Sequence, residues 1–273
     1  NGMKNQPQPV RLFYLAPMFR YERPQAGRLR QHHQFGAEVI GDQHPEIDAE
    51  IIEFAWRFLN QLGLSSLTLK INSLSDSEDR EQFTNKLFNY YSKYESELPK
   101  IDRARLQRAP MRLLDSKETK TRRISENAPR SIDFMGPKAK EHWQALIGLL
   151  DGLSEIDTNF SYKVDNTLVR GLDYYNRTVF EFEPGIEESQ TTLLAGGRYD
   201  PLMELLGGDS TPGIGFGSGI ERIILELKTQ NIPLEQIPEL RVVIISSGTK
   251  VRHKALNIAY SLRSAGISTL VAP

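Results

Sequence analysis

Residues 12–41 read LFYLAPMFRYERPQAGRLRQHHQFGAEVIG, and the rest of the chain is interpreted around this stretch. Residues 12–23 are rich in aromatic and branched side chains, as in a β-strand, and residues 24–27 contain the proline and glycine of a turn. Residues 34–40 then alternate polar and apolar side chains, which is typical of a strand with one buried face. The stretch therefore predicts a β-hairpin.

The charged side chains of this hairpin fall on one face. Because strand side chains alternate between faces, Gln34 and Glu38 share a face of the return strand, and Arg20 and Glu22 share a face of the outgoing strand. The connecting loop adds Arg28. An exposed hairpin with surface ion pairs, which contribute little stability, would show the same pattern. The residues alone therefore leave two interpretations open, a binding site and a charged surface.

Composition excludes several classes of protein. The chain has 273 residues, 39% of them hydrophobic and 25% charged, which is ordinary for a globular protein with a substantial core. No apolar run reaches the roughly 18 residues of a membrane span, and no signal-peptide pattern opens the sequence. Cysteine is absent, and the five histidines show no metal-ligand spacing. We expect neither a membrane protein nor a metal site built from protein side chains.

Positive charge is concentrated in one segment. The net charge of the whole chain is −1, which argues against a uniformly basic nucleic-acid binder. Residues 100–130, however, contain ten Lys or Arg against four Asp or Glu. A local basic patch of this kind attracts phosphate groups even in a balanced chain.

The segments that follow the hairpin, up to residue 152, predict structural elements without evident chemistry. Residues 45–62 predict an amphipathic helix, residues 67–73 a strand, and residues 76 or 77 to 91 a second helix. From about residue 93 to 152 the chain is helical and basic, with its clearest helix at residues 138–150. The apolar positions of the three helices are Ile47, Ile51, Phe54, Ala55, Phe58 and Leu62, then Phe83, Leu87 and Tyr90, then Trp143, Leu146 and Leu150.

Strand signals return in the second half. Residues 160–165 and 178–182 predict strands, and residues 193–200, LLAGGRYD, contain paired glycines that let a backbone approach a ligand closely. Residues 211–227, TPGIGFGSGIERIILEL, predict a glycine-rich strand followed by a helix that opens near Ser218.

The last segment predicts a separate α/β domain. Residues 231–239, with two prolines, form the expected linker. A strand at 240–246, a helix at 252–265 and a strand at 267–271 follow. The sequence opens without Met and stops directly after this strand, so we expect a fragment of a longer protein.

One segment combines more polar and aromatic groups than packing alone requires. Residues 168–182 read LVRGLDYYNRTVFEF, in which an Arg-Gly turn, an acid and two tyrosines precede a strand. Simple packing of the paired rings is the alternative. By contrast, GFGSGIER at residues 215–222 is by itself compatible with a packing role, since glycine-rich strand–helix joints are common.

Four motifs together resemble those of class II aminoacyl-tRNA synthetases, and most closely the histidine-specific branch, the histidyl-tRNA synthetases. FRYE at residues 19–22, with its arginine-bearing loop, resembles motif 2, and GFGSGIER resembles motif 3. LVRGLDYYNRTVFEF and LLAGGRYD resemble the two signatures that distinguish the histidine-specific members. The four motifs also occur in the order that this family shows.

The resemblance implies an α+β fold, with the class II antiparallel sheet flanked by helices, a helical insertion and the start of a C-terminal α/β domain. The catalytic domain would occupy residues 1–92 and 153–230, the insertion residues 93–152, and the start of the anticodon-binding domain residues 240–273. The motif 1 region and most of the C-terminal domain would lie outside the chain. In the family that upstream region forms the dimer interface and supplies an acid and a threonine for the substrate ammonium.

The resemblance also implies an activity. The full-length protein would be a cytoplasmic homodimer that uses ATP and Mg²⁺ to convert histidine into histidyl-adenylate, and then transfers histidine to tRNA(His). Two alternatives are a non-catalytic synthetase-like regulatory subunit of ATP phosphoribosyltransferase and a degenerate module that senses uncharged tRNA. Such paralogues lose ATP-binding arginines, whereas this sequence keeps Arg20, Arg28, Arg170 and Arg222. The missing upstream region leaves open whether the fragment alone is active.

The chemistry of activation explains the recurring arginines. The carboxylate of histidine attacks the α-phosphate of ATP, so two anions meet, and fixed guanidinium groups neutralise the charge that spreads over the phosphoryl oxygens. The resemblance assigns catalysis to Arg20 and Arg170, ATP binding to Arg20, Glu22, Arg28, His32 and Arg222, and histidine binding to Arg20, Gln34, Glu38, Arg170, Tyr174, Tyr175 and Tyr199.

Two positions depart from the family pattern. Leu29 stands where tyrosine is common, and His32 stands where phenylalanine is common. In the family the second of these rings lies against adenine. His32 must therefore stack in its place, or adenine is held less firmly.

Overall fold

The computed structural model describes residues 2–21, 29–171, 174–185, 192–233 and 240–272. The chain divides into two compact units, Asn1–Asn231 and Ile232–Pro273, which are treated separately below. Within the described residues no helix combines the length and apolar character needed to cross a membrane.

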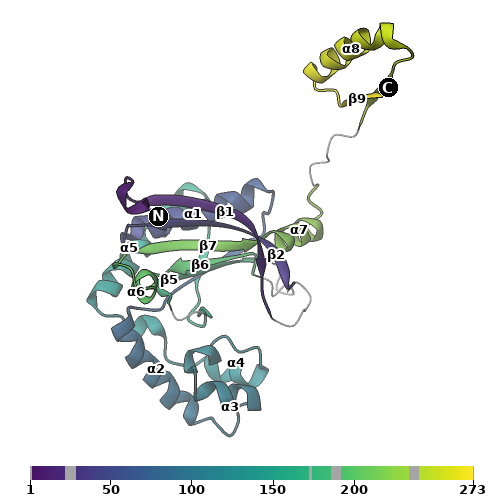
Figure 1. Ribbon diagram of the computed structural model, residues 1–273. Coiled ribbons are helices and arrows are strands. Elements are labelled where there is room, and N and C mark those ends of the chain that lie inside the picture. Colours follow the sequence, from purple (N-terminus) through teal and green to yellow (C-terminus); the bar gives the residue numbers. More distant parts are fainter. Residues whose placement is uncertain (1, 22–28, 172–173, 186–191, 234–239, 273) are drawn as a thin grey trace. The chain divides into compact units, whose positions relative to one another are not determined.

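The first unit is built on a seven-stranded sheet with the order β1-β2-β7-β6-β5-β3-β4 (Figure 1). Every neighbouring pair is antiparallel except β3 and β4, which run parallel at one edge. The predicted class II type of sheet is confirmed, with this parallel edge as a difference. The strands are Val10–Phe19 (β1), Gln31–Ile40 (β2), Leu67–Ser73 (β3), Tyr162–Val164 (β4), Asn176–Pro184 (β5), Leu194–Arg198 (β6) and Gly213–Gly219 (β7).

The predicted hairpin is confirmed as β1 and β2. Their register places Ala16 opposite Gln34 and Leu12 opposite Glu38. The outgoing strand is shorter than the predicted 12–23 and ends at Phe19, although the Arg20 amide still donates to the Arg30 carbonyl at 2.8 Å. Residues 22–28 lie outside the described part of the chain.

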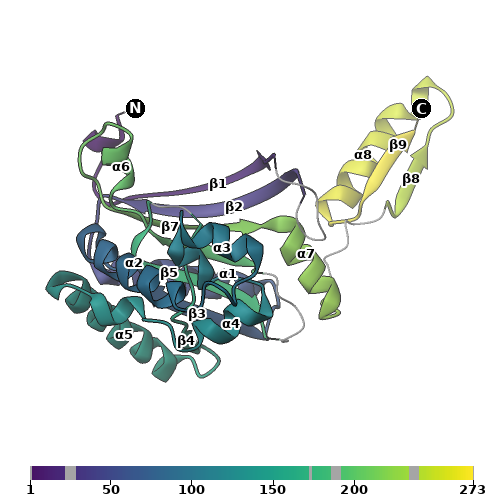
Figure 2. The same ribbon diagram turned by 90° about the horizontal axis from the view of Figure 1, so that it is seen from below.

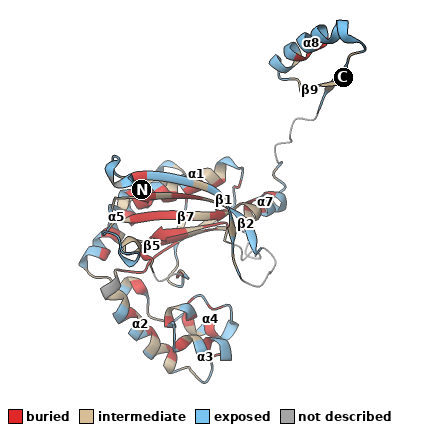
Figure 3. Ribbon diagram, viewed as in Figure 1, coloured by how far each residue is buried: buried red, intermediate tan, exposed pale blue. Residues whose placement is uncertain are grey.

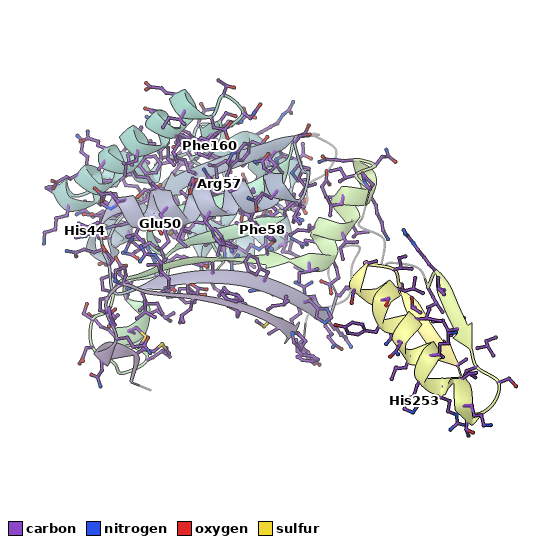
Figure 4. The ribbon with its side chains drawn as sticks, turned by 90° about the horizontal axis from the view of Figure 1, so that it is seen from above. His44, Glu50, Arg57, Phe58, Phe160 and His253 are labelled. Atoms are coloured by element: carbon purple, nitrogen blue, oxygen red, sulfur yellow. The ribbon has the colours of Figure 1, made fainter. Side chains whose placement is uncertain are left out.

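Two helices cover one face of the sheet, α1 (Pro45–Gln61) and α5 (Pro137–Ile156). Figure 4 shows α1, marked by Glu50, Arg57 and Phe58, lying along the strands. Ring contacts join helix to sheet, with the Phe35 and Phe58 centroids 4.7 Å apart. The predicted apolar stripe of α1 is buried at Ile47, Ile51 and Ala55, whereas Phe54 is 42% exposed.

Short helices gather on the other side (Figures 1 and 2). We call this group the helical subdomain; its members are α2 (Ser77–Ser92), α3 (Lys100–Leu106), α4 (Thr119–Ser125) and the 3₁₀ turns η2 (Pro110–Leu113) and η3 (Ser131–Phe134). Phe83 and Leu87 are buried as predicted. Tyr91 is buried where Tyr90 was expected to be, because its hydroxyl lies 2.7 Å from the Ser125 hydroxyl. Burial raises the pKa of Tyr91 to about 12.

The predicted domain boundaries stay a prediction. The helix α2, which precedes the predicted insertion, shares one hydrophobic cluster with the helices that follow it. The helix α5, placed in the predicted insertion, packs on α1. Contacts in the described residues thus tie both helices to more than one predicted domain.

The second unit is a β-α-β arrangement, as its sequence predicts. The strands β8 (Val242–Ile245) and β9 (Thr269–Ala272) pair in parallel. The helix α8 (Arg252–Ser264) connects them and buries Ala255 and Ala259. The parallel pairing requires such a crossover helix.

Candidate active site

One face of the sheet has a floor of very small residues. Cross-strand neighbours place Gly36 beside Gly217 and then Ala195, and place Glu38 beside Gly215 and then Gly197. We call the face that carries Gln34 and Glu38 the site face. Of the strands that form it, β5 and β7 are largely buried, whereas β1 at the edge is largely exposed (Figure 3). The glycines leave room above the sheet for polar side chains or a ligand.

Five polar side chains lie flat on this floor, each above a glycine. A methyl group at Gly217 would lie 2.5 Å from Gln34 Nε2, and one at Gly197 would lie 3.0 Å from the Tyr175 ring. Only glycine therefore accommodates these side chains in their present positions. The pairs are Tyr14 with Gly36, Gln34 with Gly217, Glu38 with Gly215, Tyr199 with Gly213, and Tyr175 with Gly197.

Glu38 and Tyr199 form the central polar pair. The Tyr199 hydroxyl donates to Glu38 Oε2 at 2.5 Å. Burial raises the pKa of Glu38, and the hydrogen bond from Tyr199 only partly offsets this effect. Burial and the nearby Glu38 charge raise the pKa of Tyr199, so Tyr199 stays a donor. The Glu38 carboxyl group is therefore partly removed from water. Among the described residues its hydrogen-bond partner is a hydroxyl group and not a cation.

Aromatic rings wall this pair. The Tyr174 and Tyr175 centroids are 4.8 Å apart, and Tyr174 meets the Tyr199 ring edge to face at 6.4 Å. Burial raises the pKa of Tyr174 to about 12. The signatures at residues 168–182 and 193–200 therefore meet at Glu38 of the hairpin.

Gln34 has a partner that sequence analysis missed. Its amide Nε2 donates to the Tyr14 hydroxyl at 2.5 Å. Tyr14 lies opposite Gly36 in the register. Its position two residues from Leu12 and Ala16, on the face of Gln34, was the available signal.

Arg170 and Arg222 are joined by a chain of polar contacts. Arg170 Nη1 lies 2.5 Å from Glu181 Oε1, and the Thr192 hydroxyl donates to the other Glu181 oxygen at 3.0 Å. Arg222 Nη1 donates to the Thr192 carbonyl at 2.8 Å. Burial raises the pKa of Glu181 even though Arg170 opposes this shift. Two arginines from distant segments thus lie on one polar chain.

Glu181 and Thr192 are further residues that sequence analysis missed. Glu181 pairs with Ala195 in the register and therefore lies on the site face. Arg170 also lies over the Tyr175 ring, with Cζ 5.5 Å from its centroid. The buried Nε of Arg170 has no hydrogen-bond partner among the described residues, so its N–H is available to a ligand.

The predicted arginines of the hairpin are less closely placed. Arg20 Nε donates to the Leu29 carbonyl at 2.6 Å on an exposed part of the chain. No contact between described residues joins Arg20 to Arg170. Glu22 and Arg28 lie outside the described residues, so their predicted roles are untested.

A histidine that the sequence analysis did not assign to the site connects motif 2 to motif 3 by hydrogen bonds. His33 donates from its amide to Glu221 at 2.9 Å, and its ring Nδ1 lies 2.9 Å from the same carboxylate. Burial alone would raise the pKa of Glu221, but these hydrogen bonds outweigh it and lower the pKa. Glu221 is in α7 (Ile220–Thr229), the helix that carries Arg222. The neighbouring His32 has a buried Nδ1 without a partner among the described residues.

A buried ionic cluster lies on the opposite face. Arg198 and Asp48 are both fully buried and form an ion pair. His142 Nε2 lies 2.8 Å from Asp48, and the Thr178 hydroxyl donates to Asp48 at 2.5 Å. Burial alone would raise the pKa of Asp48, but His142 and Arg198 outweigh it and lower the pKa.

This cluster supports the site from below. Arg198 ends β6 and directly precedes Tyr199, so consecutive residues serve opposite faces. Arg198 also donates to Asp200 at 2.9 Å, and Asp200 accepts the Gly213 amide at 3.1 Å. The turn that presents Tyr199 is thereby fixed on both sides. An acidic residue on the apolar face of the predicted α1 was the signal in the sequence.

In the described residues no group of three or more His, Cys, Asp or Glu is arranged to hold a metal ion. The expected lack of a metal site built from protein side chains stays a prediction for the chain as a whole.

Comparisons with known proteins agree with these motifs. Residues 1–223 match the model of the histidyl-tRNA synthetase family. A curated histidine–tRNA ligase of Dehalococcoides mccartyi is 46% identical over 98% of this chain and 63% of its own length, and one of Streptococcus mutans is 42% identical over 96% and 60%. The crystal structure of apo histidyl-tRNA synthetase from S. aureus matches with a TM-score of 0.73 and 34% identity, over 99% of this chain and 64% of that one.

The chain thus spans about 63% of the length of the first of these relatives. The family model covers more than half of the chain, and the identity to the curated relatives extends over nearly all of it. This chain belongs to the histidyl-tRNA synthetase family.

Proposed function

We propose that the full-length protein is a histidine–tRNA ligase, which activates histidine with ATP and transfers it to tRNA(His). One observation carries the proposal: the Glu38–Tyr199 pair and the series of polar contacts that joins Arg170 to Arg222 lie on the same glycine-rich face of the sheet. An acceptor for an imidazole and donors for a phosphate are thus available at the same surface. Family membership supports the same assignment.

Imidazole recognition is assigned to Glu38. Its carboxylate can accept a ring N–H while Tyr199 fixes its orientation, and Tyr175 completes the wall. Gln34 is assigned to the amino-acid end of the substrate, held in place by Tyr14. A site built from hydrogen-bond partners rejects analogues strongly, because they leave buried polar groups unpaired.

Charge neutralisation is assigned to arginines. Arg170, with a buried Nε that lacks a described partner, would hold the α-phosphate and the histidine carboxylate. Arg20 would approach the same phosphate from the hairpin once its contact with Leu29 is exchanged for the ligand. Removing one such donor in other enzymes lowers kcat by about 10²–10³.

The nucleotide would be held by residues from motifs 2 and 3. The planar guanidinium of Arg222 would lie on adenine, and His32 would lie on its other side. Glu22 and Arg28 would contact adenine and the terminal phosphates. Mg²⁺ would be bound by the ATP phosphates and would neutralise part of their charge.

The remaining assignments follow from the family. The basic residues of the helical subdomain would contact the tRNA acceptor arm, since Arg103, Arg108 and Arg123 are exposed there. We also propose that the full-length protein is a cytoplasmic homodimer. Sedimentation of the full-length protein tests the dimer.

Histidine-dependent ATP–pyrophosphate exchange by the full-length protein tests the activity. We expect exchange that saturates with histidine. A protein that binds histidine without any exchange would be the regulatory subunit instead. The presence of Arg20, Arg170 and Arg222 favours the enzyme over that alternative.

A further inference from the structure

Two backbone carbonyls within the histidine-specific signature, those of Gly171 and Tyr175, accept hydrogen bonds from the helical subdomain. Arg112 Nη2, from η2 of the helical subdomain, donates to the Gly171 carbonyl at 2.7 Å. Arg80 Nη2, from α2, donates to the Tyr175 carbonyl. Arg170 directly precedes the first of these carbonyls, and Tyr175 carries the second. Neither arginine was named by the motifs.

Apolar packing supports the same attachment. Leu168 and Val169, immediately before Arg170, lie in one buried cluster with Leu113 and Leu114 of the helical subdomain. The Tyr175 ring belongs to this cluster as well. Arg170 itself leaves the cluster and reaches Glu181 on the sheet. The backbone that presents Arg170 is therefore held by the subdomain as well as by the sheet, where Asn72 of β3 donates to the Leu168 carbonyl at 3.0 Å.

The glycine of the signature fits this contact. A methyl group at Gly171 would lie 2.9 Å from Arg112 Nη2 and 3.0 Å from Nη1. A side chain at position 171 would thus displace the guanidinium from the carbonyl. Glycine allows the close approach.

We propose that Arg112 and Arg80 are positioning residues for activation, which hold the two ends of residues 171–175 within the signature so that Arg170 and Tyr175 meet the substrate. Arg112 sets the end that carries Arg170, and Arg80 sets the end that carries Tyr175. The inference rests on the proposed histidine activation. The helical subdomain consequently serves the amino-acid step as well as tRNA.

Kinetics of the full-length protein separate the two ends. In ATP–pyrophosphate exchange, Arg112→Ala should lower kcat about 10- to 100-fold, the cost of misplacing a charged group by about 1 Å, with KM for histidine changed less than about twofold. Arg80→Ala should instead raise KM for histidine, because the Tyr175 wall loosens. Arg112→Lys keeps a donor and should recover part of kcat. Arg57→Ala, an exposed arginine of α1 whose ion pair is with Glu53 on the same helix, is the matched control and should exchange like the wild type.

Hydrogen exchange at residues 168–175 provides a readout independent of activity. Faster exchange in Arg112→Ala than in Arg57→Ala, at equal thermal midpoints, supports the positioning role. Equal kcat and equal protection in these two variants would overturn it. A wild type without histidine-dependent pyrophosphate exchange would instead defeat the proposed function, and the hydrogen-exchange comparison would still decide whether Arg112 holds the segment.

Discussion

Glu38, which is half-buried, and Asp48, which is fully buried, are two carboxyl groups on opposite faces of one sheet, and they differ in their partners. Asp48 pairs with Arg198 and His142, and these partners lower its pKa despite full burial. Glu38 has the Tyr199 hydroxyl as its partner, and burial raises its pKa. Arg198 and Tyr199 are consecutive residues, so one turn of chain supplies both partners.

The difference separates support from binding. A buried carboxylate with a matched cation is already satisfied and holds elements together. A carboxyl group whose charge is left without a cation in a dry site is poised to accept a donor from a ligand. We call the site face the upper face and the opposite face, with Asp48, the lower face. The glycine beneath Glu38 and the ionic cluster beneath Tyr199 belong to one arrangement, in which the ionic cluster of the lower face holds Tyr199 in position on the upper face.

The largest expected effect is the loss of stability when the ionic cluster around Asp48 is disrupted. Asp48→Ala leaves the Arg198 guanidinium buried without its carboxylate, so we expect a loss of about 3–5 kcal/mol in the free energy of unfolding. Urea denaturation measures it. A loss below about 1 kcal/mol would show that the cluster does not hold the fold.

Removing the charge on the upper face should affect binding and leave stability intact. A hydrogen bond to a charged group contributes about 1.5–3 kcal/mol, so Glu38→Gln should weaken histidine binding by about 10- to 100-fold in calorimetry. Because the pKa of Glu38 is raised in the folded state, its ionised form opposes folding at neutral pH. The variant should therefore unfold no more easily than the wild type. Unchanged affinity would exclude Glu38 from the imidazole site.

The glycine floor can be tested at Gly217. A methyl group there meets the Gln34 side chain and leaves backbone contacts free, so Gly217→Ala should displace Gln34 and raise KM for histidine severalfold. Gly152→Ala, in α5 with open space around it, is the matched control, and we expect a gain of up to about 1 kcal/mol in stability from helix propensity. Equal KM values in the two variants would contradict the role of the floor.

The smallest expected effect is a shift in pH dependence. Histidine binding requires the ionised form of Glu38, so affinity is lost as pH falls through its raised pKa. The Tyr199 hydrogen bond lowers that pKa. In Tyr199→Phe the pKa should rise further, and the loss of affinity on acidification should begin at higher pH. Coincident pH profiles for both proteins would contradict this assignment.

The sequence predicted the features that depend on the pattern of neighbouring residues along the chain. Period-two alternation placed Gln34 and Glu38 on one face, and the four motifs identified the family and its sheet type, whereas the roles of the site residues stay predictions. Glu181 was missed because its role depends on pairing β5 with β6, which no local pattern specifies. Asp48 was missed because its partner Arg198 lies 150 residues away in sequence. The predicted convergence of Arg20, Arg170 and Arg222 on the reacting phosphate likewise depends on tertiary structure, and it stays a prediction.

The sequence also did not predict the residue at which β1 ends. Aromatic residues continue to Tyr21, which favours a long strand, yet β1 ends at Phe19. Phe19 and Tyr21 are 74% and 98% exposed, so neither contributes burial that would extend the pairing. Strand propensity reflects packing against neighbours, and here the neighbours are absent among the described residues.

The most direct test is histidine-dependent ATP–pyrophosphate exchange by the full-length wild type beside Arg170→Ala. The account predicts saturable exchange in the wild type and a rate lower by about 10²–10³ in Arg170→Ala, while the variant remains folded. Exchange at the wild-type rate in Arg170→Ala, or no exchange in a wild type that binds histidine, would contradict it.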